Sequence, residues 1–181
     1  MSNTQVFVLV NVLGGVAVLG SYALGLLLYP ETRMSLWGGI QGNWQTIFTV
    51  SMLPAAIGYL FFFYVMVFRS GTEAFTQTSV LGVYTPSILC AAFLISATVW
   101  MPSTIAYLNT QQTGWRALSV ASLWITALSL IALLLVMISV KTGPAFVTTY
   151  KYIAVAGLSY IVFHCLVLDA IVWIARFPKP H

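Results

Sequence analysis

The sequence predicts an all-α integral membrane protein whose single domain is a bundle of five transmembrane helices. Hydrophobic residues make up 60% of the chain and charged residues 6%, whereas about a quarter of the residues in soluble domains are charged. Five apolar runs are each long enough to cross a bilayer, which takes about 20 helical residues. The few Lys and Arg residues stand near the ends of these runs, where lipid headgroups lie.

The five predicted spans follow one another with short polar connections. The first run begins after the stretch MSNTQ, which lacks the Lys or Arg of a secretory leader, so we expect a retained span. Pro30 ends this run, because proline disfavours a helical conformation in the residue before it. We expect no domain outside the membrane. The spans cover residues 6–29, 46–68, 79–108, 117–140 and 150–176.

An odd number of spans predicts that the N- and C-termini lie on opposite sides of the membrane. Cytoplasmic loops usually carry the excess of Lys and Arg. The N-terminal side would carry Arg69, Lys141 and Lys151, and the C-terminal side Arg33, Arg116, Arg176 and Lys179. This small excess favours a cytoplasmic C-terminus. A net charge of +4 spread over span ends is too sparse for a nucleic-acid surface, so no nucleic-acid partner is expected.

Prolines and glycines mark special positions in the second and third spans. Pro54 predicts a kink in the second span, and Gly58 predicts a close approach to a neighbouring helix. Pro86 and Pro102 lie in the third span, and each is expected to free a backbone carbonyl of the preceding turn. The third span is therefore expected to be bent and packed inside the bundle.

The last span carries the only acidic residue and the only histidine that lie deep in an apolar run, Asp169 and His164. A charge at the centre of a membrane helix costs about 3 kcal/mol on insertion scales, so such residues usually face protein or a wet cavity. At 100° per residue, five positions separate the two side chains by about 140°, so we expect them not to contact each other. Arg176 or a loop arginine is a candidate partner for Asp169. Other candidate partners are Asn11, Tyr59, Trp100, Tyr107 and Asn109.

Several roles fit each of these two residues. Asp169 either bridges helices or touches a ligand. His164 is a buried, hydrogen-bonded side chain, an axial ligand of haem or chlorophyll, or a polar contact to an organic ligand. The sequence alone leaves these alternatives open.

Aromatic and amide side chains near the span ends are candidates to line a pocket. Trp100, Tyr107 and Asn109 cluster near the end of the third span. Trp37 and Trp44 lie beside glycines in the long first loop, where they are either interfacial anchors or part of a lid over a cavity.

Sequence motifs of several chemistries are absent. The chain has no GxSxG, HExxH, CxxC, P-loop or dinucleotide fingerprint. Cys90 and Cys165 both lie in apolar runs, where thiols behave as small hydrophobic groups. One His and one Asp within the spans cannot complete a usual metal site. We therefore expect no catalytic residue and no metal site, and an enzyme is less favoured than a binding protein.

Two stretches carry a resemblance to a known family. TVWMPSTIAYLNTQQTGWRALSVASLW, with its Leu123-Trp124 pair, and SMLPAAIGY resemble segments of the tryptophan-rich sensory protein or translocator protein family. The chain departs from the family pattern at Val50 and Pro54, where the family has Trp and Tyr, and in the fifth span, which lacks an Asn-centred pattern.

The resemblance implies a five-helix bundle, often dimeric, with a cavity under the first loop that binds porphyrins, sterols or other flat hydrophobic ligands. It places Trp100 and Trp124 near that cavity, and Trp37 and Trp44 in its cover. A porphyrin-type ligand is the cofactor that the resemblance suggests.

Taken together, the sequence predicts a multi-pass, receptor-like membrane protein that binds or transports a hydrophobic small molecule in an aromatic-lined cavity. Two alternatives stay open. One is an accessory or assembly subunit of a larger membrane complex, with a pigment held by His164. The other is a small membrane enzyme acting on a lipid or isoprenoid, with Asp169 or His164 as its base. The expected ligand contacts are Asp169, His164, Trp100, Trp124, Tyr59, Tyr107, Asn109, Trp37 and Trp44.

Overall fold

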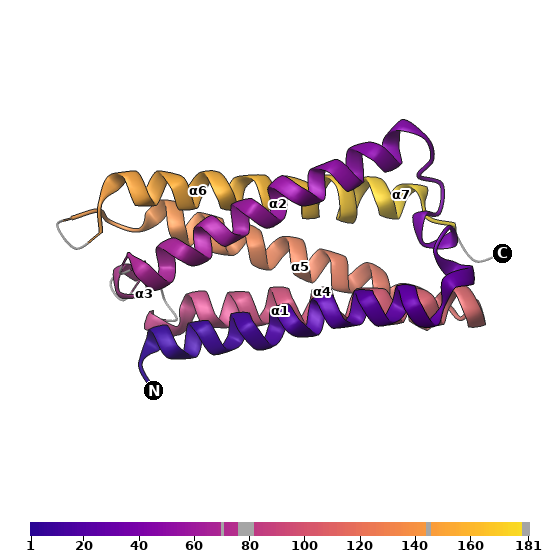
Figure 1. The fold of residues 1–181 in the computed structure, drawn as a ribbon, viewed down its shortest axis with the longest axis horizontal. Coiled ribbons are helices and arrows are strands. Elements are labelled where there is room, and N and C mark those ends of the chain that lie inside the picture. The colour runs from indigo at the N-terminus through magenta and orange to yellow at the C-terminus, as the bar shows by residue number, and fades with distance from the viewer. Residues whose placement is uncertain (70, 76–81, 144–145, 179–181) are drawn as a thin grey trace.

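Five long helices form the protein in the computed structural model, which describes residues 1–69, 71–75, 82–143 and 146–178 (Figure 1). Four of them are regular α-helices: α1 (Asn3–Leu28), α2 (Asn43–Phe68), α4 (Thr85–Thr110) and α5 (Thr113–Ser139). The fifth is one continuous rod of α6 (Thr148–Phe163), a π-helix (His164–Trp173) and α7 (Ile174–Arg176).

All five rods are long and apolar enough to cross a membrane. This confirms the predicted all-α class and the number of helices long and apolar enough to span a membrane. Short elements join them: the 3-10 turns Pro30–Thr32, Ser35–Trp37 and Gly82–Tyr84, and the single-turn helix α3 (Gly71–Ala74). The third span was expected to begin at residue 79, but residues 79–81 lie outside the described part of the chain.

The first helix begins three residues earlier than hydropathy predicts, because a capping box extends it. The Ser2 hydroxyl accepts a hydrogen bond from the Gln5 backbone N–H, and the Gln5 side chain accepts one from the Ser2 N–H. These two bonds satisfy N–H groups that a helix start leaves without partners. The polar stretch MSNTQ therefore belongs largely to α1.

Neighbouring helices pack in a ring that is almost open at one point. α1 packs along α4, α4 along α5, α5 along the fifth rod, and the fifth rod along α2, whereas α2 and α1 touch very little. In Figure 1, α2 and α6 lie above α1 and α4, and α5 lies between the two pairs. The chain begins at one end of the bundle, and its last described residues lie at the other end.

The two prolines of the third span have different effects. Pro86 lies in the first turn of α4, where no helical hydrogen bond is lost, so the expected free carbonyl does not arise there. Pro102 is inside α4, where its missing N–H removes one backbone hydrogen bond of the helix. The two hydroxyls that follow Pro102 bond to the next carbonyls of the preceding turn: Ser103 Oγ donates to the Val99 carbonyl at 2.7 Å, and Thr104 Oγ1 to the Trp100 carbonyl at 2.8 Å.

The predicted close approach at Gly58 is present, and its partner is Gly157 of α6. A Cβ atom added to Gly58 would lie 2.7 Å from the Gly157 carbonyl oxygen, and one added to Gly157 would overlap the Gly58 carbonyl. The two backbones touch because neither residue has a side chain. This contact sets the crossing of α2 over the fifth rod.

The first loop folds against the end of the fifth rod. Trp173 Nε1 donates to the Leu36 carbonyl at 2.9 Å, and the Gly39 N–H donates to the Arg176 carbonyl at 3.0 Å. Gly38 has a φ of +56°, and a Cβ there would lie 2.8 Å from the Phe177 ring. The loop therefore closes this end of the bundle behind Trp173.

Candidate functional site

A cavity of about 560 Å³ lies inside the ring of helices. All five membrane rods contribute to its wall, and most of the lining side chains are aliphatic or aromatic. This volume and lining are typical of sites for small organic ligands. The lining side chains that carry a polar atom are Asn11, Tyr22, Tyr59, Trp100, Thr126, His164, Cys165, Asp169 and Trp173.

The cavity has a lateral mouth between α1 and α2. Its wall includes Val12 and Leu19 of α1, which are 52% and 72% exposed, and Met52 and Leu60 of α2, which are 46% and 63% exposed. These residues lie in the middle of helices long enough to span a bilayer. In a bilayer spanned by these helices, the mouth would lie at the level of the lipid chains.

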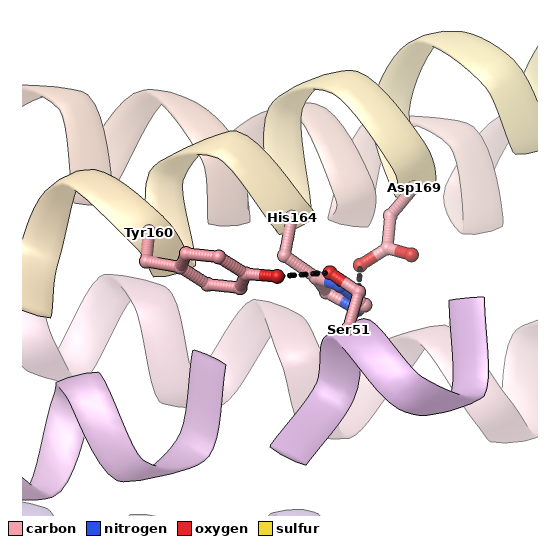
Figure 2. Close-up of polar contacts among 4 residues, drawn as sticks. All are labelled: Ser51, Tyr160, His164 and Asp169. Atoms are coloured by element: carbon pink, nitrogen blue, oxygen red, sulfur yellow. Dashed lines mark hydrogen bonds and ion pairs between the residues drawn. The ribbon is translucent and has the colours of Figure 1, made fainter. Parts of the chain in front are cut away.

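His164 and Asp169 lie side by side, contrary to the expected separation of about 140°. The distance from His164 Nε2 to Asp169 Oδ2 is 3.7 Å (Figure 2). The expectation assumed an α-helix, but residues His164–Trp173 form a π-helix, whose i→i+5 hydrogen bonds stack residues five apart. The π-helix thus brings the acid and the histidine of the span together on the cavity wall.

The second partner of His164 is Ser51 of α2, which was not among the expected candidates. His164 Nδ1 lies 2.9 Å from Ser51 Oγ, and the Tyr160 hydroxyl lies 3.4 Å from the same oxygen (Figure 2). These contacts hold the imidazole between α2 and the fifth rod. A lone Ser in an apolar run gives no signal in sequence, because serine hydroxyls in helices usually bond to their own backbone.

Ser51, His164 and Asp169 are the residue types of a catalytic triad, but their surroundings do not support nucleophilic catalysis. Ser51 is 5% exposed and does not line the cavity, so its oxygen cannot reach a bound molecule. It also lies inside α2, whose backbone N–H groups are engaged in helical bonds and offer no oxyanion hole. The contacts with Ser51 and Asp169 position the His164 ring.

Asp169 has few partners for a partly buried acid. Its side chain is 27% exposed, and this surface lies on the cavity. The Cys165 thiol is within hydrogen-bonding reach of the carboxyl group. Among the described residues no arginine forms an ion pair with Asp169, so the expected pairing with Arg176 is absent.

A second polar group, closer to the chain start, joins three helices. The Tyr59 hydroxyl of α2 donates to Asn11 Oδ1 of α1 and lies 3.3 Å from Cys90 Sγ of α4. Asn11 Nδ2 donates to the Phe7 carbonyl at 2.8 Å. Asn11 therefore links α1 to α2 as a hydrogen-bond acceptor, while its own donor bonds within α1. It pairs with Tyr59 and not with His164 or Asp169.

Aromatic rings surround the Asp169 end of the cavity. The Trp100 ring makes edge contacts with Tyr22 and Trp173, at centroid distances of 5.6 and 5.5 Å. Trp173 Nε1 is bonded to the first loop. Trp100 Nε1, in contrast, is buried without a hydrogen-bond partner in the described part of the chain.

The other expected contacts in α4 and α5 lie away from the cavity. Trp124 is 39% exposed and is absent from the lining. Tyr107 is buried beside Phe177, and its hydroxyl donates to the Pro178 carbonyl at 3.3 Å. Asn109 is exposed near the end of α4.

The two loop tryptophans also lie outside the lining. Trp37 packs edge-on against Phe48 at a centroid distance of 6.4 Å. Trp44 is 42% exposed at the start of α2. Of the nine expected ligand contacts, the structure brings four to the cavity: Asp169, His164, Trp100 and Tyr59.

The site offers poor ligation for a metal or a haem. No group of three His, Cys, Asp or Glu side chains that could hold a metal occurs among the described residues. Axial ligation by His164 needs a free ring nitrogen. Nδ1 is engaged by Ser51, and Nε2 faces Asp169, so a metal would have to displace one of these partners.

Comparison with family models, curated proteins and solved structures finds no match for this chain. The resemblance to the tryptophan-rich sensory protein or translocator protein family remains a prediction from the quoted residues.

Proposed function

We propose that this protein binds a hydrophobic small molecule that enters the bundle from the lipid bilayer, as a receptor or as part of a transport route. The observation that carries the proposal is the cavity of about 560 Å³ with its mouth between α1 and α2. Apolar and aromatic side chains would supply most of the contact area, and the polar groups near Asp169 would orient the ligand.

Gly15 gives a direct way to fill the cavity. It lines the cavity, and a Cβ atom added there meets no other atom within 4 Å. Gly20 lies in the same helix and is equally free of neighbours, but it does not line the cavity. A side chain at residue 15 can therefore start into the cavity without a backbone clash, so Gly15→Leu is expected to reduce the cavity, and Gly20→Leu is its matched control.

The test is photolabelling in nanodiscs with an uncharged sterol that carries a diazirine. We expect labelled peptides to include cavity residues such as Phe63 and Trp100. Gly15→Leu should reduce labelling of these peptides about tenfold, equivalent to about 1.4 kcal/mol of binding free energy, and Gly20→Leu should leave it unchanged. Labelling confined to the outer faces of the helices, or unchanged in Gly15→Leu, would contradict the proposal.

We also propose that the two termini lie on opposite sides of the membrane, with the C-terminus in the cytoplasm. The first part is supported by the positions of the N-terminus and of the last described residues, which lie at opposite ends of the bundle (Figure 1). The small excess of Arg and Lys at the C-terminal end supports the second. We further propose that the protein forms a homodimer or is part of a larger membrane complex. In both cases lipid would surround the helices.

A further inference from the structure

The chemistry of the Asp169 end of the cavity restricts the ligand class. A carboxylate placed among apolar side chains is costly unless a cation or several hydrogen-bond donors compensate its charge. Asp169 has the Cys165 thiol in reach and the His164 ring at 3.7 Å, which is longer than a hydrogen bond. Its carboxyl oxygens therefore retain unused acceptor capacity on the cavity surface.

No other charged group of the cavity compensates Asp169. Among the described residues, the cavity lining includes no Lys or Arg. His164, Cys165 and Tyr22 are the titratable neighbours on this side, and the Tyr22 hydroxyl forms no hydrogen bond in the described part of the chain. Without a full charge partner, a carboxyl group in apolar surroundings is held in its neutral form. A ligand that supplies a positive charge beside Asp169 would therefore gain an ion pair that the empty site lacks.

Tryptophan and tyrosine rings are well placed for a cation beside a carboxylate. Trp100 packs against both Tyr22 and Trp173 on the cavity wall, and Trp173 lies one turn beyond Asp169. Ring faces of Trp and Tyr attract ammonium groups, most strongly in desolvated sites. The rest of the cavity is apolar and takes a hydrocarbon or aromatic body.

We propose that the cavity selects lipophilic amines, with the Asp169 carboxylate as counter-ion of the ammonium group and the Tyr22, Trp100 and Trp173 rings around it. This inference rests on the proposed function and names its ligand class. It also excludes hydrophobic acids: a carboxylate on the ligand would meet the ionised Asp169, and no Lys or Arg occurs among the described lining residues to offset the repulsion. Carboxylate-bearing porphyrins belong to this excluded group.

The experiment compares three probes that share one ring system and differ in charge. They are the tricyclic secondary amine desipramine, its uncharged N-acetyl derivative, and the carboxylic acid with the same rings. Each competes with the photolabelling sterol for wild-type protein in nanodiscs of phosphatidylcholine, a lipid without net charge. We expect the amine to compete at least about tenfold more strongly than the N-acetyl derivative, and the acid to compete least.

Asp169→Asn tests the counter-ion at almost constant volume. We expect it to reduce competition by the amine about tenfold or more and to leave competition by the N-acetyl derivative unchanged. Ser159→Ala is the control, because it removes an exposed hydroxyl of the same rod outside the cavity lining and should leave competition by all three probes unchanged. If Asp169→Asn fails to fold, the relative strength with which the three probes compete on wild-type protein still decides the proposal.

The outcomes separate the two proposals. Equal competition by all three probes, or amine competition that survives Asp169→Asn, would overturn the amine inference while the binding function stands. Absence of sterol labelling in the cavity would overturn both.

Discussion

Tyr59 shows what one hydroxyl contributes inside this bundle. It donates to Asn11 on α1 and contacts Cys90 on α4, so a single side chain of α2 links three helices. In a bilayer the lipid offers no alternative partner to these groups once the helices have formed. The bond therefore fixes α1, which otherwise packs mainly along α4.

We expect Tyr59→Phe to destabilise the bundle by about 1 kcal/mol, because it leaves Asn11 Oδ1 without its donor; interhelical hydrogen bonds in membranes contribute about 0.6 to 1.7 kcal/mol. The measurement is thermal unfolding in detergent, followed by tryptophan fluorescence. Tyr152→Phe is the control, since Tyr152 is 67% exposed. Equal melting temperatures for the two variants would show that the Tyr59 bond is energetically neutral.

Ser51 and His164 illustrate a limit of sequence reasoning at the residue scale. His164 is conspicuous because it is the one histidine deep in an apolar span. Ser51 is one of many hydroxyls in the spans, and only the crossing of α2 over the fifth rod places its oxygen 2.9 Å from the imidazole. The importance of such a residue depends on a neighbour 113 positions away.

At the scale of elements, the π-helix is the feature that creates the polar site. In an α-helix, His164 and Asp169 would point in different directions, and one of them would face lipid or another helix. The π-helix over His164–Trp173 stacks them and turns both toward the cavity. π-helical segments are rare and are frequent at functional sites.

The contact between Gly58 and Gly157 holds α2 against the fifth rod and so keeps Ser51 beside His164. We expect Gly157→Ala to cost about 3 kcal/mol, the upper range for overpacking, because the new methyl group would overlap backbone and not a flexible side chain. Gly20→Ala, at a position with no neighbour within 4 Å, should be neutral. Melting temperature by size-exclusion chromatography after heating compares the two; a stable Gly157→Ala protein would contradict the packing argument.

At the scale of the whole molecule, the ring of helices is closely packed on four sides and sparsely packed on the fifth, where α1 meets α2. The strong contacts run from α1 through α4, α5 and the fifth rod to α2, and the gap between α2 and α1 becomes the cavity mouth. Trp173 and the first loop close the bundle behind the cavity. Entry from the side is therefore the route that the architecture favours.

The proposed topology makes a labelling prediction. Native Cys90 and Cys165 are buried, so they provide an unreactive background. Thr142→Cys and Gln41→Cys place single exposed thiols at opposite ends of the bundle. With a cytoplasmic C-terminus, a membrane-impermeant maleimide added outside intact cells should label Thr142→Cys, and should label Gln41→Cys only after permeabilisation.

Two other labelling results would contradict the topology. Labelling of both thiols from outside intact cells would show that the two ends of the bundle are not on opposite sides. Labelling of Gln41→Cys alone would reverse the orientation.

The sequence by itself determined the class of the protein, its five membrane helices and the placement of Asp169 and His164 in the interior. These features follow from the length and polarity of each run. Each spanning segment must by itself be apolar over the thickness of the bilayer and must satisfy its backbone hydrogen bonds within its own helix. The close approach at Gly58 was likewise visible, since a glycine in an apolar helix leaves a surface for another backbone.

The tertiary structure alone decided how those parts form a site. Three features depend on how the helices cross. They are the π-helix at residues 164–173, the pairing of Ser51 with His164, and the orientation of Trp100, not Trp124, toward the cavity. The physical reason is that α- and π-helices both satisfy the backbone within the segment, so hydropathy does not distinguish them. Side-chain packing of this segment against α2 and α5 then selects the helix type.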